Sequence, residues 1–510
     1  MRATIIRSNI LTLDDRLERC DAALTIAGQI QMVGTYENLL AIAPSAAVLD
    51  KRDFHLTPGL TDAHIHLVGY GFSLANINLE GTRSSSEALL RVAARLAESG
   101  DGWVLGRGFN INLWGDAAYP TAAMLDEIAP HQPVALRSRD GHSLWVNSRV
   151  LELAGIGSAT PDPVGGVIVR DERGNPTGTL LENAMALVTR VQPPVSLEDA
   201  VDAGRLAAAQ MRRYGFTAVH TMALEPNLYL HAVQELEARG ELNLRVWACI
   251  PHADLESIEA LGLRGGLGDR VRLSGVKFFA DGALGSRTAL MHEAYNGYPN
   301  DCGVAVDSPA TVLERGRRAL ALGFSPVIHA IGDRANTEML DVLSALAPLA
   351  QRRGLRLRLE HAQHLTPADV KRFAALGIVV SAQPIQLPGD TATIDALLGS
   401  TRAATSYAFR DLLDSGATLA LGSDAPVATP DPALGFEAAV QRLGANGKPW
   451  HGEQAITRLE ALRGYTTGAA LAAGWEAWYG RVAPGCAADF TLWDGDPLLD
   501  GSRPLEALSL

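Results

Sequence analysis

Strand-like runs alternate with helical runs along most of this 510-residue sequence, and this alternation restricts the fold more than any other feature. Several of the apolar, β-branched runs are separated by amphipathic segments, which lie at about 197–214, 228–239, 309–322 and 335–352. Repeated strand–helix units imply a parallel sheet, and eight of them predict a closed (β/α)8 TIM-like barrel. The predicted barrel strands are 57–66, 216–221, 244–250, 271–280, 326–329, 355–361, 378–381 and 418–424.

The two ends of the chain are rich in strand-forming residues and contain no long amphipathic helix. The N-terminal end has strand-like runs at 3–7, 22–26 and 29–33, and the C-terminal end has a similar run at 485–493. Each end alone supplies too few strands for a stable core, so we predict that they pair. We therefore expect a composite β-sandwich domain of residues 1–56 plus 476–510, and a metal-dependent barrel of residues 57–475.

The connection after the first barrel strand is too long for a simple loop. It contains a helical segment at 86–98, strand-like runs near residues 103, 135 and 168, and many turn residues. Connections of this length carry secondary structure of their own. We predict an inserted α/β subdomain at residues 70–192.

Composition excludes several classes of protein. The net charge is -13 and no basic stripe offsets it, which argues against a nucleic-acid partner. No run reaches the roughly 18 apolar residues of a membrane-spanning helix, and we expect no signal peptide. The four cysteines are far apart and match no paired motif, which is typical of reduced thiols in a cytoplasmic protein.

Ligand-type side chains end several of the predicted barrel strands. His64 and His66 lie two positions apart, so they project to the same side of the first strand. Because the carboxyl ends of the strands form the active face of such a barrel, these side chains should converge. The others are Lys277, His329, His361 with His364 three residues later, and Asp424. This set of nitrogen and oxygen donors suits Zn²⁺ or another divalent metal.

Each of these residues also has an ordinary structural interpretation. His361 could pair with Glu360, an unmodified Lys277 could pair with Asp281, and Asp424 could cap the next segment. We interpret His220 and His252, which also lie near strand ends, as supporting residues. Ligand-type residues end strands one, five, six and eight, all of which meet at one face of the predicted barrel. A metal site explains this arrangement better than a separate structural role for each residue.

The chain resembles the amidohydrolase superfamily (the amidohydrolase 3 family), and within it the YtcJ-like and N-substituted-formamide-deformylase-like hydrolases. The matching segments are 28–34, 58–66, 140–148, 275–282, 329–333, 359–361, 421–424 and 484–490. The resemblance covers nearly the whole chain. It implies a metal-dependent hydrolase with a distorted (β/α)8 barrel and a β-sandwich made from both termini.

The resemblance also implies roles for individual residues. His64 and His66 would bind a buried metal ion, and His329 and His361 a second, more exposed one. Lys277 would be carboxylated by CO2 and bridge the two ions, and Asp424 would bind metal and accept a proton from water. His142, in the insertion, would contact the substrate carbonyl, and a role in a turn is nearly as well supported.

The functional expectation is hydrolysis of a C–N bond in an amide, an N-formyl amine or a cyclic amide. One alternative is a mononuclear deaminase of a heterocycle, but such enzymes place a Glu shortly after the strand-five histidine, and the segment 329–333 has none. Another alternative is a metal-free scaffold, which would have lost ligands that this chain keeps. We expect a small-molecule substrate and leave a homodimer open.

Overall fold

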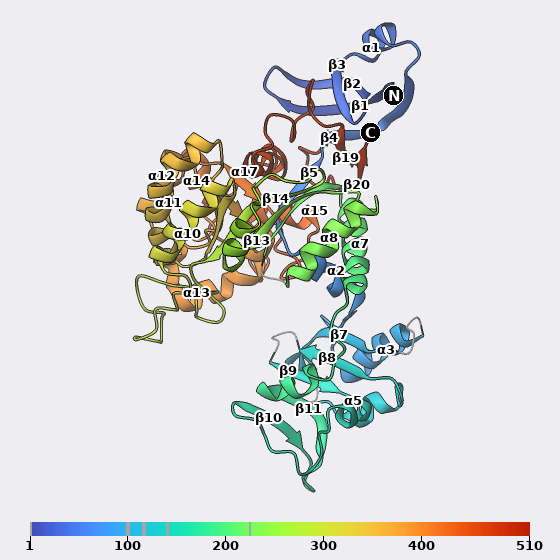
Figure 1. Cartoon of the computed structure of the whole chain (residues 1–510), viewed down its shortest axis with the longest axis vertical. Helices are drawn as coiled ribbons and strands as arrows, with labels where there is room; N and C mark the ends of the chain where they lie inside the picture. Colours follow the sequence, from blue (N-terminus) through green and yellow to red (C-terminus); the bar gives the residue numbers. More distant parts are fainter. Residues whose placement is uncertain (1–2, 98–101, 115–118, 139–141, 224–225) are drawn as a thin grey trace. The chain divides into compact units, whose positions relative to one another are not determined.

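The computed structural model describes residues 3–97, 102–114, 119–138, 142–223 and 226–510. The chain forms two compact units, which are described separately (Figure 1). One unit comprises Met1–Tyr70 with Ala207–Leu510, and the other comprises Gly71–Leu206. Among the described residues, no helix is both long enough and apolar enough to cross a membrane.

Eight parallel strands form the central sheet of the larger unit, and their order in space follows their order in the chain. The backbone N–H of Asp424 donates to His64 O (2.6 Å) and that of His66 to Ala425 O (2.8 Å), so the segments after the first and last strands are joined. The predicted TIM-like barrel is therefore confirmed. Its strands are β5 (Leu60–Ile65), β12 (Phe216–Thr221), β13 (Arg245–Pro251), β14 (Val271–Phe279), β15 (Ser325–Ala330), β16 (Arg358–His361), β17 (Val379–Ala382) and β18 (Leu419–Leu421).

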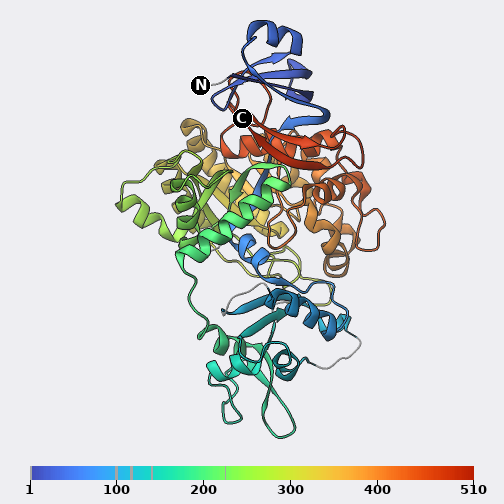
Figure 2. The ribbon, with the colours of Figure 1, turned by 90° about the vertical axis from the view of Figure 1, so that its right-hand side faces the viewer.

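Helices separate most of the barrel strands, and local signals set their ends. Helix α10 (Pro309–Leu322) begins after Ser308, whose hydroxyl accepts from the Thr311 N–H, and ends at Gly323 with φ 88°. Figure 2 shows these helices around the strands. The other helices of this region are α8 (Asn227–Ala238), α9 (Leu255–Ala260), α11 (Asp333–Arg353), α12 (Pro367–Leu376), α13 (Leu387–Ala403), α14 (Phe409–Asp414), α15 (Pro432–Gln441), α16 (Arg458–Arg463) and α17 (Ala469–Ala473).

Both ends of the chain contribute to one mixed sheet, as predicted. The C-terminal strand β19 pairs antiparallel with β4, with Phe490 opposite Pro58 and Trp493 opposite His55. Ile6, Ile10 and Leu56 from one end pack with Phe490 and Leu492 from the other in one buried core. The strand order is β20 (Pro504–Ser509), β19 (Asp489–Trp493), β4 (Ala47–Pro58), β1 (Ala3–Asp14), β2 (Leu17–Ile26) and β3 (Gln29–Gly34), with helix α1 (Tyr36–Ile42) beside it.

Gly59 connects the terminal sheet directly to the barrel, because β4 ends at Pro58 and β5 begins at Leu60. A Cβ atom at Gly59 would lie 1.9 Å from the Thr217 hydroxyl of β12, so no larger residue fits there. This close approach explains why a glycine precedes the strand that carries His64. The terminal sheet thereby anchors the first strand of the site.

The smaller unit has its own six-stranded sheet and its own cores, which confirms an inserted α/β structure. Phe109, Trp114 and Trp145 contact one another in one core, with ring centroids 5.6–6.2 Å apart. Its strands, in spatial order, are β10 (Gly166–Arg170), β11 (Pro176–Glu182), β9 (Ser143–Val146), β8 (Val134–Ser138), β7 (Val104–Phe109) and β6 (Ile77–Asn78). Its helices include α3 (Ser85–Leu96), α4 (Ala122–Asp126), α5 (Ser148–Leu153) and α6 (Ala186–Thr189), while α2 (Leu67–Ala75) and α7 (Leu197–Arg213) connect to the other unit.

Candidate metal centre

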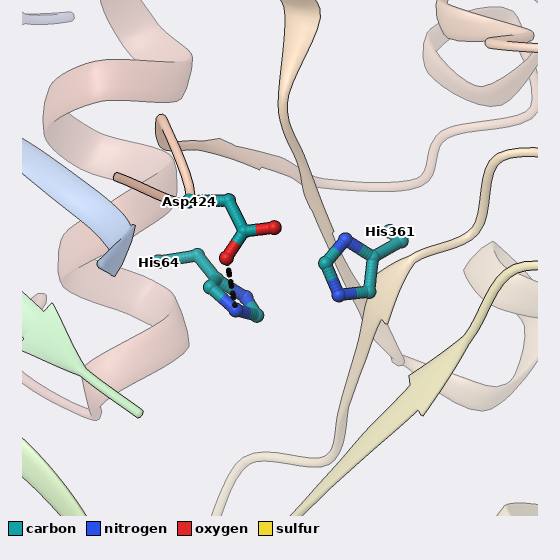
Figure 3. Close-up of side chains that lie close together, drawn as sticks. All are labelled: His64, His361 and Asp424. Atoms are coloured by element: carbon teal, nitrogen blue, oxygen red, sulfur yellow. Dashed lines mark ion pairs between the residues drawn. The ribbon is translucent and has the colours of Figure 1, made fainter. Parts of the chain in front are cut away.

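Three of the predicted ligands gather at the carboxyl ends of the barrel strands. His64 comes from β5, His361 ends β16, and Asp424 lies three residues beyond β18. One donor atom from each lies within 4.8 Å of the others, and all three side chains are buried. Figure 3 shows the two imidazoles and the carboxylate facing a common space. His66 joins them, with its Nε2 3.3 Å from Asp424 Oδ1.

Small residues allow Asp424 to reach the histidines. A Cβ at Gly422 would lie 2.5 Å from the His64 backbone nitrogen, so only glycine lets the segment after β18 approach β5. Asp62 Oδ1 then accepts N–H groups from both His64 (3.0 Å) and Ser423 (3.1 Å). Burial raises the pKa of Asp62 to about 7. This carboxyl group holds the two ligand-bearing segments together.

His329 and Lys277 complete the group on the neighbouring strands. The ring of His329, from β15, lies 4.5 Å from that of His361 between centroids. Lys277, from β14, is 1 % exposed. Within the described part of the chain, Lys277 Nζ has no hydrogen-bond partner.

The imidazoles of His64, His329 and His361 are neutral at ordinary pH. Burial lowers the pKa of His64 to about 4. Burial, and then the neighbouring His64, lowers the pKa of His361 to about 3, and burial holds that of His329 well below its usual value. A neutral imidazole is the form that binds a metal ion.

Hydrogen bonds decide which ring nitrogen of two of these histidines stays available. His361 Nδ1 donates to the Gln383 side-chain oxygen (2.8 Å), which leaves its Nε2 lone pair free. His329 Nε2 donates to the Gly282 carbonyl (3.0 Å), which leaves its Nδ1 free. Gln383 was not predicted as a site residue, although its place directly after β17 is a usable signal.

A second glutamine from the same loop orients the candidate base. Gln386 Nε2 donates to Asp424 Oδ2 (3.0 Å), so Oδ1 is the oxygen that faces His64 and His66. Burial alone would raise the pKa of Asp424, but the adjacent histidines outweigh it and hold the pKa well below its usual range. Asp424 is therefore ionised at neutral pH.

Two of the structural alternatives for these residues are wrong. Asp281 does not pair with Lys277, because its oxygens accept the backbone N–H groups of Leu290, Ile331 and Gly332 (2.8–3.0 Å). Burial raises the pKa of Asp281 to about 7. Glu360 does not pair with the adjacent His361 either; its carboxylate lies against His64.

The remaining histidines near strand ends make other contacts. His220 Nδ1 accepts from Arg358 (2.9 Å). His252 Nε2 lies 3.2 Å from Asp307, and His364 Nδ1 lies 2.8 Å from the Ser406 hydroxyl. Each of the three side chains therefore has a partner outside the cluster, although Nε2 of His220 and of His364 is buried without a hydrogen-bond partner among the described residues.

His142 belongs to the smaller unit, so its role at this site stays a prediction. Its Nδ1 lies 3.1 Å from Glu182 Oε2, and both side chains are exposed. Asp140 and Gly141, which precede it in the resembling segment, lie outside the described residues.

The donor set fits a divalent cation. Neutral imidazole nitrogens and an ionised carboxylate converge in a buried space, and these are the ligands that Zn²⁺ prefers. The ring nitrogen of His66 that faces this space is Nε2, which lies 3.3 Å from Asp424 Oδ1.

Comparisons with known proteins agree with this geometry. A family model described as "Amidohydrolase family" matches residues 47–499. The chain is 35% identical to protein LONG AFTER FAR-RED 3 of Arabidopsis thaliana, over 96% of this chain and 87% of that protein. It is 32% identical to the Bacillus subtilis protein YtcJ, named as an amidohydrolase, over 98% and 96%. It is 31% identical to the N-substituted formamide deformylase of Arthrobacter pascens, over 97% and 93%.

A solved structure is similar over the same length. The crystal structure of a metal-dependent hydrolase from Pyrococcus horikoshii superimposes with a TM-score of 0.81 at 28% identity. The alignment covers 98% of each chain. Both the barrel and the two additional sheets therefore have a counterpart in a known fold.

Proposed function

This chain belongs to the amidohydrolase family of metal-dependent hydrolases, and from that premise we propose that it hydrolyses a carbon–nitrogen bond in an amide, an N-formyl amine or a cyclic amide. The convergence of His64, His361 and Asp424 at the mouth of the barrel carries this proposal. The relationship to a formamide deformylase over nearly the whole chain supports the choice of bond.

We propose that His64, His66 and Asp424 hold one metal ion, and that His329 and His361 hold a second. Zn²⁺ matches these ligands best, and other divalent metals remain within the proposal. The chemistry that such a cation supplies when bound is Lewis acidity toward a carbonyl oxygen and toward water.

The chain's own residues then handle the proton. Asp424 is ionised, and Gln386 fixes one of its oxygens so that the other faces the histidines. In the proposed reaction, Asp424 Oδ1 accepts a proton from the attacking water and passes it to the leaving nitrogen. A small-molecule substrate, a homodimer and a cytoplasmic location stay predictions.

A substrate panel tests the proposed bond. The purified protein, loaded with Zn²⁺, is given N-alkyl and N-aryl formamides, N-acyl amines, cyclic amides and amino-substituted heterocycles. We expect release of an amine and a carboxylic acid from a formamide or an N-acyl amine, or ring opening of a cyclic amide to a single product that carries the new carboxylate, and no reaction with metal-free protein. Turnover confined to ammonia release from the heterocycles would replace the proposal by a deaminase.

Lys277 gives a separate prediction. Burial lowers its pKa, which favours the neutral amine that attacks the carbon of CO2 and loses a proton to give an anionic carbamate. We propose that Lys277 in this form would supply two anionic oxygens as ligands for the ions. Lys277→Ala is then expected to lose one of these ions, and added short carboxylic acids are expected to restore part of the activity.

The control for this experiment is Lys371→Ala, which changes an exposed lysine. Metal content is measured by mass spectrometry of the purified variants, with and without bicarbonate during metal loading. Lys277→Ala with the metal content and activity of the unmutated protein would exclude the carbamate as a ligand.

A further inference from the structure

The second ring nitrogen of His64 contacts a buried carboxylate that the proposed reaction does not use. His64 Nδ1 lies 2.6 Å from Glu360 Oε2, and the exposed fractions of the two side chains are 2% and 0%. Glu360 comes from β16, which is not a neighbour of β5 in the sheet. The contact therefore crosses the interior of the barrel.

Arg358 holds the Glu360 carboxylate in this interior. Its Nε donates to Glu360 Oε1 (2.6 Å) and its Nη2 to Oε2 (3.2 Å), and neither side chain is exposed. Residues two apart on a strand point to the same side, which places the pair together.

Arg358 is itself fixed to three other strands. Its Nη2 also donates to Ala63 O in β5 (2.7 Å) and to the Ser381 hydroxyl in β17 (3.1 Å). Its Nη1 donates to His220 Nδ1 in β12 (2.9 Å). Barrel interiors are normally packed with apolar side chains, and a buried ion pair adds little stability over such packing. This pair therefore calls for a role other than stability.

The chemistry of the contact suggests that role. A carboxylate accepts the proton of Nδ1–H, so it sets the tautomer in which Nε2 of His64 has a free lone pair. That nitrogen lies 3.4 Å from Asp424 Oδ1, on the side where the other candidate ligands converge. A negative partner behind a ligating imidazole also makes the ring a stronger donor.

We infer that Glu360, held by Arg358, is a positioning residue that fixes the tautomer of His64 and raises the affinity of the site for its metal ion. This inference rests on the proposed function, because it assumes that His64 binds metal. It concerns residues outside the ligand set, and it predicts a change in metal affinity that can be measured without any substrate.

The first test is Glu360→Gln. Glutamine has the same shape as glutamate, but only one of its two terminal side-chain atoms is an acceptor oxygen. Arg358 and His64 direct N–H donors at both of these atoms, so one donor would face the NH2 group and lose its hydrogen bond. We expect the affinity for the tightest-bound Zn²⁺, measured by competition with a chromophoric chelator, to fall roughly 10–100-fold. The matched control is Glu453→Gln, which alters an exposed His–Glu pair (His451 Nδ1 to Oε1, 2.9 Å) and should leave the affinity unchanged.

Glu360→Gln leaves the buried charge of Arg358 without its partner, which can destabilise the fold and weaken metal binding for that reason alone. A second variant therefore separates a positioning role from an effect on folding. Glu360→Leu combined with Arg358→Met replaces the whole ion pair by apolar side chains, a change that proteins often tolerate. We expect this double variant to keep its circular dichroism spectrum and still bind Zn²⁺ at least about 10-fold more weakly. With Co²⁺ in place of Zn²⁺, its visible absorption bands should shift.

The outcomes are distinct. If the folded double variant binds Zn²⁺ as tightly as the unmutated protein, Glu360 has no positioning role and the inference is overturned. If the unmutated protein itself binds no Zn²⁺ or other divalent ion, the proposed function fails instead. A loss in both Glu360 variants, with Glu453→Gln unchanged, supports the inference.

Discussion

Replacing His64 by alanine is expected to bring the metal content of the purified protein close to zero and to abolish hydrolysis. His64 lies at the centre of the cluster, because its ring is 4.8 Å from that of His361 and 5.9 Å from that of His66 between centroids. Its Nε2 is also 3.4 Å from Asp424 Oδ1. A site that loses a central ligand binds metal weakly, and the proposed reaction needs the metal.

The control for this variant is His231→Ala, which removes an exposed histidine of helix α8. Metal content and turnover are measured together, and a circular dichroism spectrum confirms that both variants fold. The assignment of His64 as a ligand fails if the His64 variant retains full metal content and full activity.

The barrel could be predicted because its strands leave a local signal. Each is a short apolar run, and helix-ending residues such as Gly323 and Gly354 stand just before two of them. The pairing of β19 with β4 was also predictable, since neither terminus has enough strands alone.

The candidate ligands could be predicted for a related reason. A parallel barrel brings the carboxyl ends of all its strands together, so His64, His361 and Asp424 converge although they are far apart in the chain. Sequence position alone identified them. It also identified Lys277 and His329, which lie on the two strands between β13 and β16.

The groups that orient these ligands were not predictable in the same way. Glu360 precedes His361 in the chain, yet it contacts His64, which lies 296 positions away. Gln383 and Gln386 act through single hydrogen bonds whose direction depends on side-chain torsions. Contacts of this kind depend on distances across the barrel interior. The spacing of residues along the chain does not predict such distances.

Replacing Asp424 by asparagine is expected to lower turnover roughly 10²–10⁴-fold, the usual contribution of a positioned general base. Asparagine keeps the shape and the contact with Gln386, but it cannot accept a proton from water. Metal should still bind in part, because the histidines remain. The matched control is Asp414→Asn, which alters an exposed carboxylate paired with Arg410.

The pH dependence gives this prediction a second readout. The pKa of Asp424 lies below its usual range, so the base is present at neutral pH and is lost only as pH falls through that depressed pKa. Activity of the unmutated protein should therefore fall on the acid side, both as His64 and His361 gain protons (pKa about 4 and about 3) and as Asp424 does. In Asp424→Asn only the part of this fall that belongs to the histidines should remain. Near-normal turnover in that variant would mean that another group moves the proton, and His361 and His142 would be the first to replace in turn.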